Sequence, residues 1–178
     1  KSFEQLLFKS GFQFSDIQKN LLFLQAYKDN GVITEEDIVE AIPKTLQDNI
    51  FDLTQLILGK KIDQARDLVK DLTLQREDEI KLIAIMLGQF RLYTQVKILL
   101  ESGQTESQMV SSLGHYLGRN PNPYQIKFAL RDTRALSLNF LQDSIRYLIQ
   151  ADYQIKTGVY EKGYLFEKAL LQIASQSN

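Results

Sequence analysis

Few side chains in this sequence could perform chemistry. The one histidine, His115, lies near a predicted helix end in "SSLGHYLG". A catalytic triad or a multi-histidine metal site needs partners that the sequence does not supply, so we favour a surface or capping role. Carboxylates cluster in "EEDIVE" and "REDEIK", but both clusters begin predicted helices, where acidic side chains stabilise the helix dipole. "LGKK" lacks the rest of a phosphate-binding loop. The sequence therefore predicts no catalytic residue, no metal and no cofactor.

Two charged residues lie where helical periodicity predicts apolar stripes. At about 100° per residue, Arg91 shares a face with Ile83 and Leu87, and Asp152 shares a face with Leu148. A buried charge is stable only when it is paired. We therefore expect Arg91 and Asp152 to form a buried structural pair, or each to meet another buried polar group. The alternative is that Arg91 extends to the bundle edge and reaches water.

Basic residues recur in "IKFALRDTR", where Lys127, Arg131 and Arg134 could contact phosphate groups. A solvated helix face explains the same pattern. The formal net charge of the chain is -1 and its pI is about 5.9. Because a nucleic-acid-binding domain usually carries a basic excess, we favour the solvated face.

The elements that must position these residues are helices, since strand-like alternation is rare. Four predicted starts carry a hydroxyl residue followed three positions later by Asp or Gln, as in a capping box: Ser15, Thr34, Thr45 and Thr105. Asn122 before Pro123 marks a fifth start, and Gly59 marks a helix end. The predicted helices cover residues 2–9, 16–30, 35–42, 46–58, 61–74, 77–102, 105–117, 123–135, 138–157 and 164–175.

The predicted fold is all-α, with a break in the sequence style at Pro43. Residues 1–43 form three short helices, a size at which independent folding is marginal. Residues 44–178 form a bundle of longer helices. Because the first residue is Lys1 rather than Met, we expect the chain to be part of a longer protein in which upstream residues support the short helices.

Composition excludes several classes of protein. The chain of 178 residues is 44% hydrophobic and 24% charged, which is typical of a domain with a core. It has no cysteine, so disulfides and thiolate metal sites are excluded and a reducing compartment is favoured. The longest apolar run, Leu82 to Leu87, is too short to cross a bilayer.

Several stretches follow one another in a recognisable order. They are "LLFLQAYKDNGVITEEDIVEAIP" at 21–43, "NIFDLTQLILGKKIDQARDLVKDL" at 49–72, "GQFRLYTQVKILLESGQTESQMVSSLG" at 88–114, "NPYQIKFALRDTRALS" at 122–137 and "LIQADYQIKTG" at 148–158. Together they resemble the C-terminal region of the delta subunit of the bacterial DNA polymerase III clamp loader. The resemblance covers essentially the whole chain. It departs from the family at Asn122, where His is commoner, and in "VYEKGYLFEKAL" at 159–170.

The resemblance implies a role in assembly. Residues 1–43 would be the end of an AAA+ lid-like helical domain, and residues 44–178 would be a helical collar domain. In this family delta does not hydrolyse ATP. It binds and opens the sliding clamp through its N-terminal domain, and its collar joins delta-prime and the ATPase subunits in a five-membered ring. We therefore expect a non-enzymatic assembly module of bacterial DNA replication, cytoplasmic and engaged with DNA only indirectly.

Two other function classes fit the sequence less well. A helical adaptor could bind a peptide in an apolar groove, and a helical nucleic-acid-binding domain could use Lys127, Arg131 and Arg134. An enzyme is the least supported class. For the assembly role, we expect the helices within 46–74 and 138–175 to face the neighbouring subunits.

Overall fold

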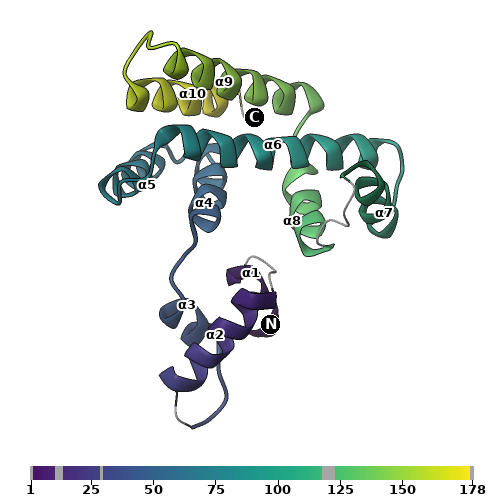
Figure 1. Ribbon diagram of the computed structural model, residues 1–178. Helices are drawn as coiled ribbons and strands as arrows, with labels where there is room; N and C mark the ends of the chain where they lie inside the picture. The colour runs from purple at the N-terminus through teal and green to yellow at the C-terminus, as the bar shows by residue number, and fades with distance from the viewer. Residues whose placement is uncertain (1, 11–13, 29, 118–122, 177–178) are drawn as a thin grey trace. The chain divides into compact units, whose positions relative to one another are not determined.

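The computed structural model describes residues 2–10, 14–28, 30–117 and 123–176, and these residues form helices and connections without a strand. The predicted all-α fold is therefore confirmed. In chain order the helices are α1 (Ser2–Lys9), α2 (Phe14–Tyr27), α3 (Glu35–Ala41), α4 (Leu46–Leu58), α5 (Ile62–Leu74), α6 (Glu79–Glu101), α7 (Glu106–Leu117), α8 (Pro123–Thr133), α9 (Leu138–Lys156) and α10 (Lys162–Gln176) (Figure 1).

The chain divides into two compact units, Lys1–Asn49 and Ile50–Asn178. The sequence predicts the boundary between residues 43 and 44, whereas the two units separate inside the first turn of α4. The reason is that Ile50 is the first fully buried hydrophobic residue of α4.

The first unit has a small core. It consists of Leu6, Leu24, Ile38 and Ile42, one or two from each of α1, α2 and α3 with its C-cap. Lys9 is buried beside this core and donates a hydrogen bond of 3.0 Å from Nζ to the carbonyl oxygen of Ile42. This bond satisfies a buried ammonium group and ties the end of α1 to the end of α3.

Three of the four predicted capping boxes are confirmed. Asp37 and Thr34 exchange hydrogen bonds of 2.8 and 3.3 Å, Asp48 and Thr45 exchange bonds of 2.8 and 3.2 Å, and Gln108 and Thr105 exchange bonds of 2.8 and 3.4 Å. Ser15 is not a cap, because α2 begins one residue earlier and the Ser15 backbone is already helical. Asn122, the fifth predicted start, lies outside the described residues.

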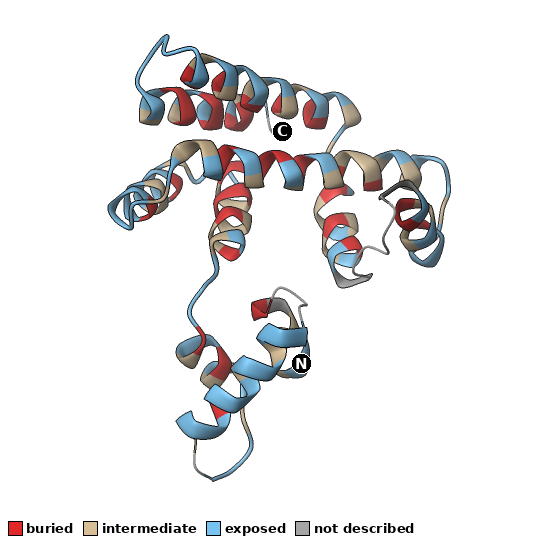
Figure 2. Ribbon diagram, viewed as in Figure 1, coloured by how far each residue is buried: buried red, intermediate tan, exposed pale blue. Residues whose placement is uncertain are grey.

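Helix α6 is the centre of the second unit and contacts α7, α8, α9 and α10. In Figure 1, α9 and α10 run side by side along one side of α6, while α4 and α8 approach it from the other side. Length and composition alone would allow α6 to cross a membrane. Its packing between helices on two sides explains its apolar character without a membrane, as the buried segments in Figure 2 show. Its buried residues are Leu82, Ile83, Met86, Leu87, Phe90, Tyr93 and Val96.

Two helix ends in the second unit carry a basic residue in the left-handed conformation. The φ angle is 55° at Lys60 after α4 and 62° at Arg76 after α5. At the first end, Lys61 N donates to the Leu56 carbonyl at 2.9 Å and Lys60 N donates to the Ile57 carbonyl at 3.1 Å, which is the Schellman pattern. Gly59 marks the end of α4 as predicted, but the left-handed residue is Lys60.

Candidate assembly surface

A buried carboxylate joins three helices of the second unit. Asp132 on α8 is 5% exposed at its side chain. It accepts hydrogen bonds from Tyr93 Oη at 2.8 Å, from Gln55 Nε2 at 2.9 Å and from Arg131 Nε at 2.8 Å. Gln89 donates in turn to the Tyr93 hydroxyl at 2.9 Å.

The electrostatics of this cluster keep Tyr93 protonated. Burial, followed by the negative charge of Asp132, raises the pKa of Tyr93 well above its usual value. Tyr93 is therefore a hydrogen-bond donor at neutral pH. Because the Asp132 carboxylate already has three donors from the protein, the cluster is a structural tie between α4, α6 and α8 rather than a reactive site.

The predicted buried pair of Arg91 and Asp152 is wrong. Arg91 is exposed, and within the described residues neither hydrogen bonds nor ion pairs join it to Asp152. Asp152 instead accepts a hydrogen bond of 2.7 Å from Lys156 Nζ, one turn along its own helix. The predicted stripe of Arg91 is only partly covered: Ile83 and Leu87 are buried, but Arg91 lies on the open side of α6.

Asp152 likewise lies beside the packed face of its helix rather than within it. The face of α9 that packs into the core includes Ser144, Leu148, Ala151 and Ile155, whereas Ile149 is 47% exposed. The packed face of α9 thus combines large residues, Phe140 and Leu141 among them, with the small residues Ser144 and Ala151. Small residues allow close packing, and the larger Ile149 remains at the surface together with the half-buried Asp152.

The three basic residues predicted to contact nucleic acid all lie on the surface. Lys127 and Arg131 occupy successive turns of α8, and Arg134 follows the helix. Arg131 is held by Asp132 and lies 5.3 Å from the centre of the Phe128 ring. Their contact with nucleic acid stays a prediction. His115 is exposed in the last turn of α7, and no cluster of metal-binding side chains occurs among the described residues.

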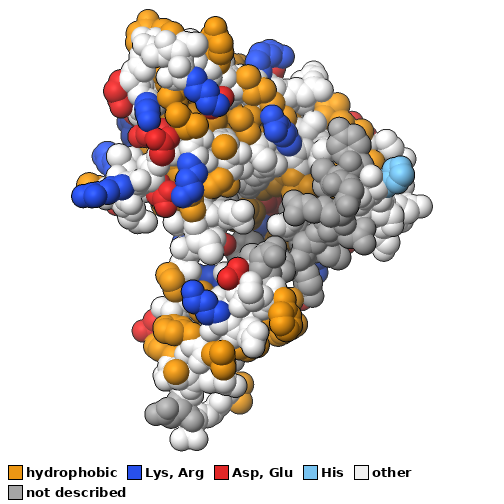
Figure 3. All heavy atoms as spheres, viewed as in Figure 1, with side chains coloured by type: hydrophobic (Ala, Val, Ile, Leu, Met, Phe, Trp, Pro, Cys, Tyr) orange, Lys and Arg blue, Asp and Glu red, His pale blue; other side chains and the backbone are white. Residues whose placement is uncertain are grey.

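Exposed large hydrophobic side chains of the second unit are concentrated on a few elements. Among the residues whose burial is described, all of them except Ile98 lie on α5, on α9, on α10 or in the connection between α9 and α10: Leu74, Ile149, Tyr153, Val159, Tyr160, Tyr164 and Leu171. The helices predicted to face neighbouring subunits, within residues 46–74 and 138–175, include these elements, although the individual side chains were not predicted. Figure 3 shows hydrophobic and basic side chains intermixed over much of this unit.

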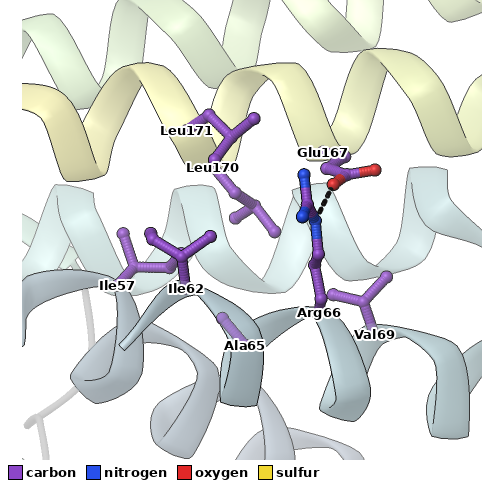
Figure 4. Close-up of a pocket in the computed structure, with 8 residues that line it drawn as sticks. All are labelled: Ile57, Ile62, Ala65, Arg66, Val69, Glu167, Leu170 and Leu171. Atoms are coloured by element: carbon purple, nitrogen blue, oxygen red, sulfur yellow. Dashed lines mark hydrogen bonds and ion pairs between the residues drawn. The ribbon is translucent and has the colours of Figure 1, made fainter. Parts of the chain in front are cut away.

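A groove lies between α5 and α10, with the end of α4 at one side (Figure 4). Its volume is about 30 Å³, and its lining is apolar except for Arg66 and Glu167, which form an ion pair across it. The apolar lining residues are Ile57, Ile62, Ala65, Val69, Leu170 and Leu171. The groove is thus an apolar trough with one neutralised charge pair.

The outer side of α10 extends this groove. We call its outward residues the α10 stripe: Tyr164, Lys168, Leu171, Gln172 and Ser175. With Arg66 and Glu167 they border an open groove of about 440 Å³. The α10 stripe and the trough together form a continuous surface that includes helices from both regions selected by the sequence.

The turn before α10 is fixed by polar contacts. Glu161 accepts hydrogen bonds from the backbone N–H groups of Gly163 and Tyr164 at 3.0 and 2.9 Å, and these bonds lower the pKa of Glu161. Lys162 donates to Asp78 at the start of α6, with an Nζ–O distance of 3.0 Å. The Tyr160 and Tyr164 rings lie 5.9 Å apart. The two exposed tyrosines therefore belong to a turn that these polar contacts hold in place.

Comparisons with known proteins agree with this architecture. Residues 47–173 match the sequence model of the family described as DNA polymerase III delta subunit, C-terminal domain. The chain is 32% identical over 164 residues to DNA polymerase III subunit delta of Bacillus subtilis, covering 92% of this chain and 45% of that protein. A solved structure, the Bacillus subtilis DNA clamp loader delta protein, has a TM-score of 0.83 at 30% identity and covers 98% of this chain and 50% of its own.

The chain spans about half the length of these relatives. The family model covers most of the second unit and the start of α4. The chain therefore belongs to the DNA polymerase III delta subunit family, and residues 47–173 correspond to its C-terminal domain.

Proposed function

We propose that this chain is a non-enzymatic assembly module of a bacterial DNA polymerase III clamp loader. Its second unit would be the collar that joins delta-prime and the ATPase subunits, and residues 1–43 would be the end of a lid-like domain. The protein would act in the cytoplasm at the replication machinery. Clamp binding and opening would belong to the N-terminal part of the full-length subunit.

The observation that carries this proposal is the exposed apolar surface of α5, α9 and α10 in a chain of this family. A surface that leaves Tyr164, Leu171 and the other exposed apolar side chains in water is stabilised when a partner covers it. The buried Asp132 carboxylate already accepts hydrogen bonds from three protein donors, which supports a structural role for it.

Co-purification tests the proposal. The chain is co-expressed with the ATPase subunit and delta-prime of its own loader, and complexes are separated by size-exclusion chromatography at micromolar concentration. We expect a stable complex that the double substitution Tyr164→Ala and Leu171→Ala weakens. Ile98→Ala is the matched control, because Ile98 is 45% exposed but lies on α6, outside the surface. A folded chain that forms no complex with either subunit would refute the assembly role.

A further inference from the structure

We propose that the α10 stripe docks an amphipathic helix of a neighbouring loader subunit, and that this helix presents a carboxylate to Lys168. The inference rests on the proposed function and adds the chemistry of the partner element. It concerns Lys168 alone, because a partner that covers the apolar side chains beside Lys168 would also cover its charged ammonium group.

Lys168 lies between two exposed apolar side chains on α10. Tyr164 precedes it by one turn and is 56% exposed, and Leu171 follows it by one turn and is 38% exposed. A partner that covers both apolar side chains must also cover Lys168. In the part of the chain that the structure describes, Lys168 has neither a hydrogen bond nor an ion pair. Covering an ammonium group without an acceptor is unfavourable, so a partner that binds here should supply an anionic one.

The neighbouring charged side chains already have partners within the chain and do not require a carboxylate from a bound subunit. Arg66 and Glu167 neutralise each other at the wall of the trough. Lys162 at the start of α10 is paired with Asp78. The pKa of Lys162 is raised and that of Asp78 is lowered, first of all by their mutual hydrogen bond. The requirement for a carboxylate is therefore confined to Lys168.

The shape of the surface favours a helix as the partner element. The α10 stripe runs from Tyr164 to Ser175, which is about 16 Å or three turns along the helix axis. Helices α5 and α10 form the two sides of the groove, and a third helix can place its side-chain ridge between them. We infer a partner helix of at least three turns, with apolar residues toward Leu171 and Asp or Glu near its middle.

Binding to the purified ATPase subunit and delta-prime of the same loader tests the inference. We expect Lys168→Glu to weaken the binding of one subunit about tenfold or more, and Lys168→Arg to retain most of it. Lys70→Glu is the matched control, since Lys70 is exposed on α5 and has only a 3.7 Å contact with Asp67. This variant carries the same change of charge outside the α10 stripe. Circular dichroism confirms that each variant is folded.

A photo-crosslinking residue at position 172 then identifies the partner segment. We expect the captured peptide to be an amphipathic helix with an acidic residue, and its change to Lys should restore binding of the Lys168→Glu chain.

If Lys168→Glu and Lys70→Glu bind equally while Tyr164→Ala and Leu171→Ala weaken binding, the carboxylate is refuted but the assembly role stands. A dimer of the chain that Leu171→Asp dissociates would show that a second copy, not a loader helix, occupies the surface. Wild-type chain that binds neither subunit would refute the assembly role itself.

Discussion

Tyr93 on α6 donates a hydrogen bond of 2.8 Å to Asp132 on α8, across 39 residues of sequence. Gln55 on α4 donates to the same carboxylate oxygen. Three helices therefore meet at a single charged group. A hydrogen bond to a buried charge contributes more than one between neutral groups, so this cluster should contribute measurably to the stability of the second unit.

Tyr93→Phe keeps the ring in the core and removes the donor. We expect the free energy of unfolding in urea to fall by about 1–3 kcal/mol. Tyr153→Phe is the control, because Tyr153 is 66% exposed and the loss of its hydroxyl should be almost neutral. Equal unfolding midpoints for Tyr93→Phe and the wild-type protein would contradict the structural role of the Asp132 cluster.

Arg91→Ala tests the exposed position of this arginine. Surface substitutions usually change stability by less than about 0.5 kcal/mol, whereas breaking a buried ion pair costs about 3–5 kcal/mol. We expect the small effect in urea unfolding. A loss of several kcal/mol would mean that Arg91 is buried and paired after all.

The ion pair of Asp78 and Lys162 should make stability depend on pH. The hydrogen bond from Lys162, together with the Ile80 backbone N–H, lowers the pKa of Asp78 below its ordinary value of 3.8. The folded state therefore gains stability from this carboxylate above pH 3.8, and the gain is lost as the pH falls through the lowered folded-state pKa.

Asp78→Asn isolates this effect, because Asn still caps a helix well. We expect the variant to unfold at lower urea concentration than the wild-type protein at pH 7, and the two midpoints to converge as the pH falls below 3.8. A difference between the midpoints that stays constant down to pH 2 would exclude the ion pair as its source.

Ala151→Leu tests the packing face of α9. Ala151 is 4% exposed, so a larger side chain must displace its neighbours, and overpacking of this kind typically costs about 1–3 kcal/mol. Ile149→Ala changes a side chain that is 47% exposed and should have a smaller effect. The reverse order of the two unfolding free energies would restore the face predicted from the sequence.

Lys60→Gly should stabilise the protein. A side chain in the left-handed conformation is strained, and Gly relieves that strain at a helix end. We expect the unfolding free energy to rise by up to about 1 kcal/mol. In contrast, Lys81→Gly places Gly inside α6 and should lower the unfolding free energy by about 1 kcal/mol. Equal effects of the two substitutions would show that the conformation of Lys60 carries no strain.

Local signals in the sequence predicted much of the fold. Capping boxes at Thr34, Thr45 and Thr105 were predictable because both partners lie within one turn. The helix period also predicts the extent of α6, residues 77–102 against the observed Glu79–Glu101. These features depend on neighbours in the chain, so they can be recognised before the tertiary structure is known.

Features that depend on distant partners were not predictable in the same way. Asp132 follows an arginine in "LRDTR", a pattern typical of a solvated face, and its donors Gln55 and Tyr93 lie far away in sequence. The apolar pattern alone does not locate the packing face of α9, because Ser144 and Ala151 are buried whereas Ile149 is exposed. Close helix contact favours the small residues, and only tertiary packing reveals that choice.

The position of α6 also determines how the second unit exposes its backbone to solvent. Local opening of α6 would separate it from α7, α8, α9 and α10 at once. We therefore expect the amide hydrogens in the middle of α6 to exchange with deuterium only when the whole unit unfolds. The first unit has a core of Leu6, Leu24, Ile38 and Ile42, so we expect smaller fluctuations to release its amides. The slowest-exchanging backbone of the protein should then belong to the same helix that leaves Arg91 in water.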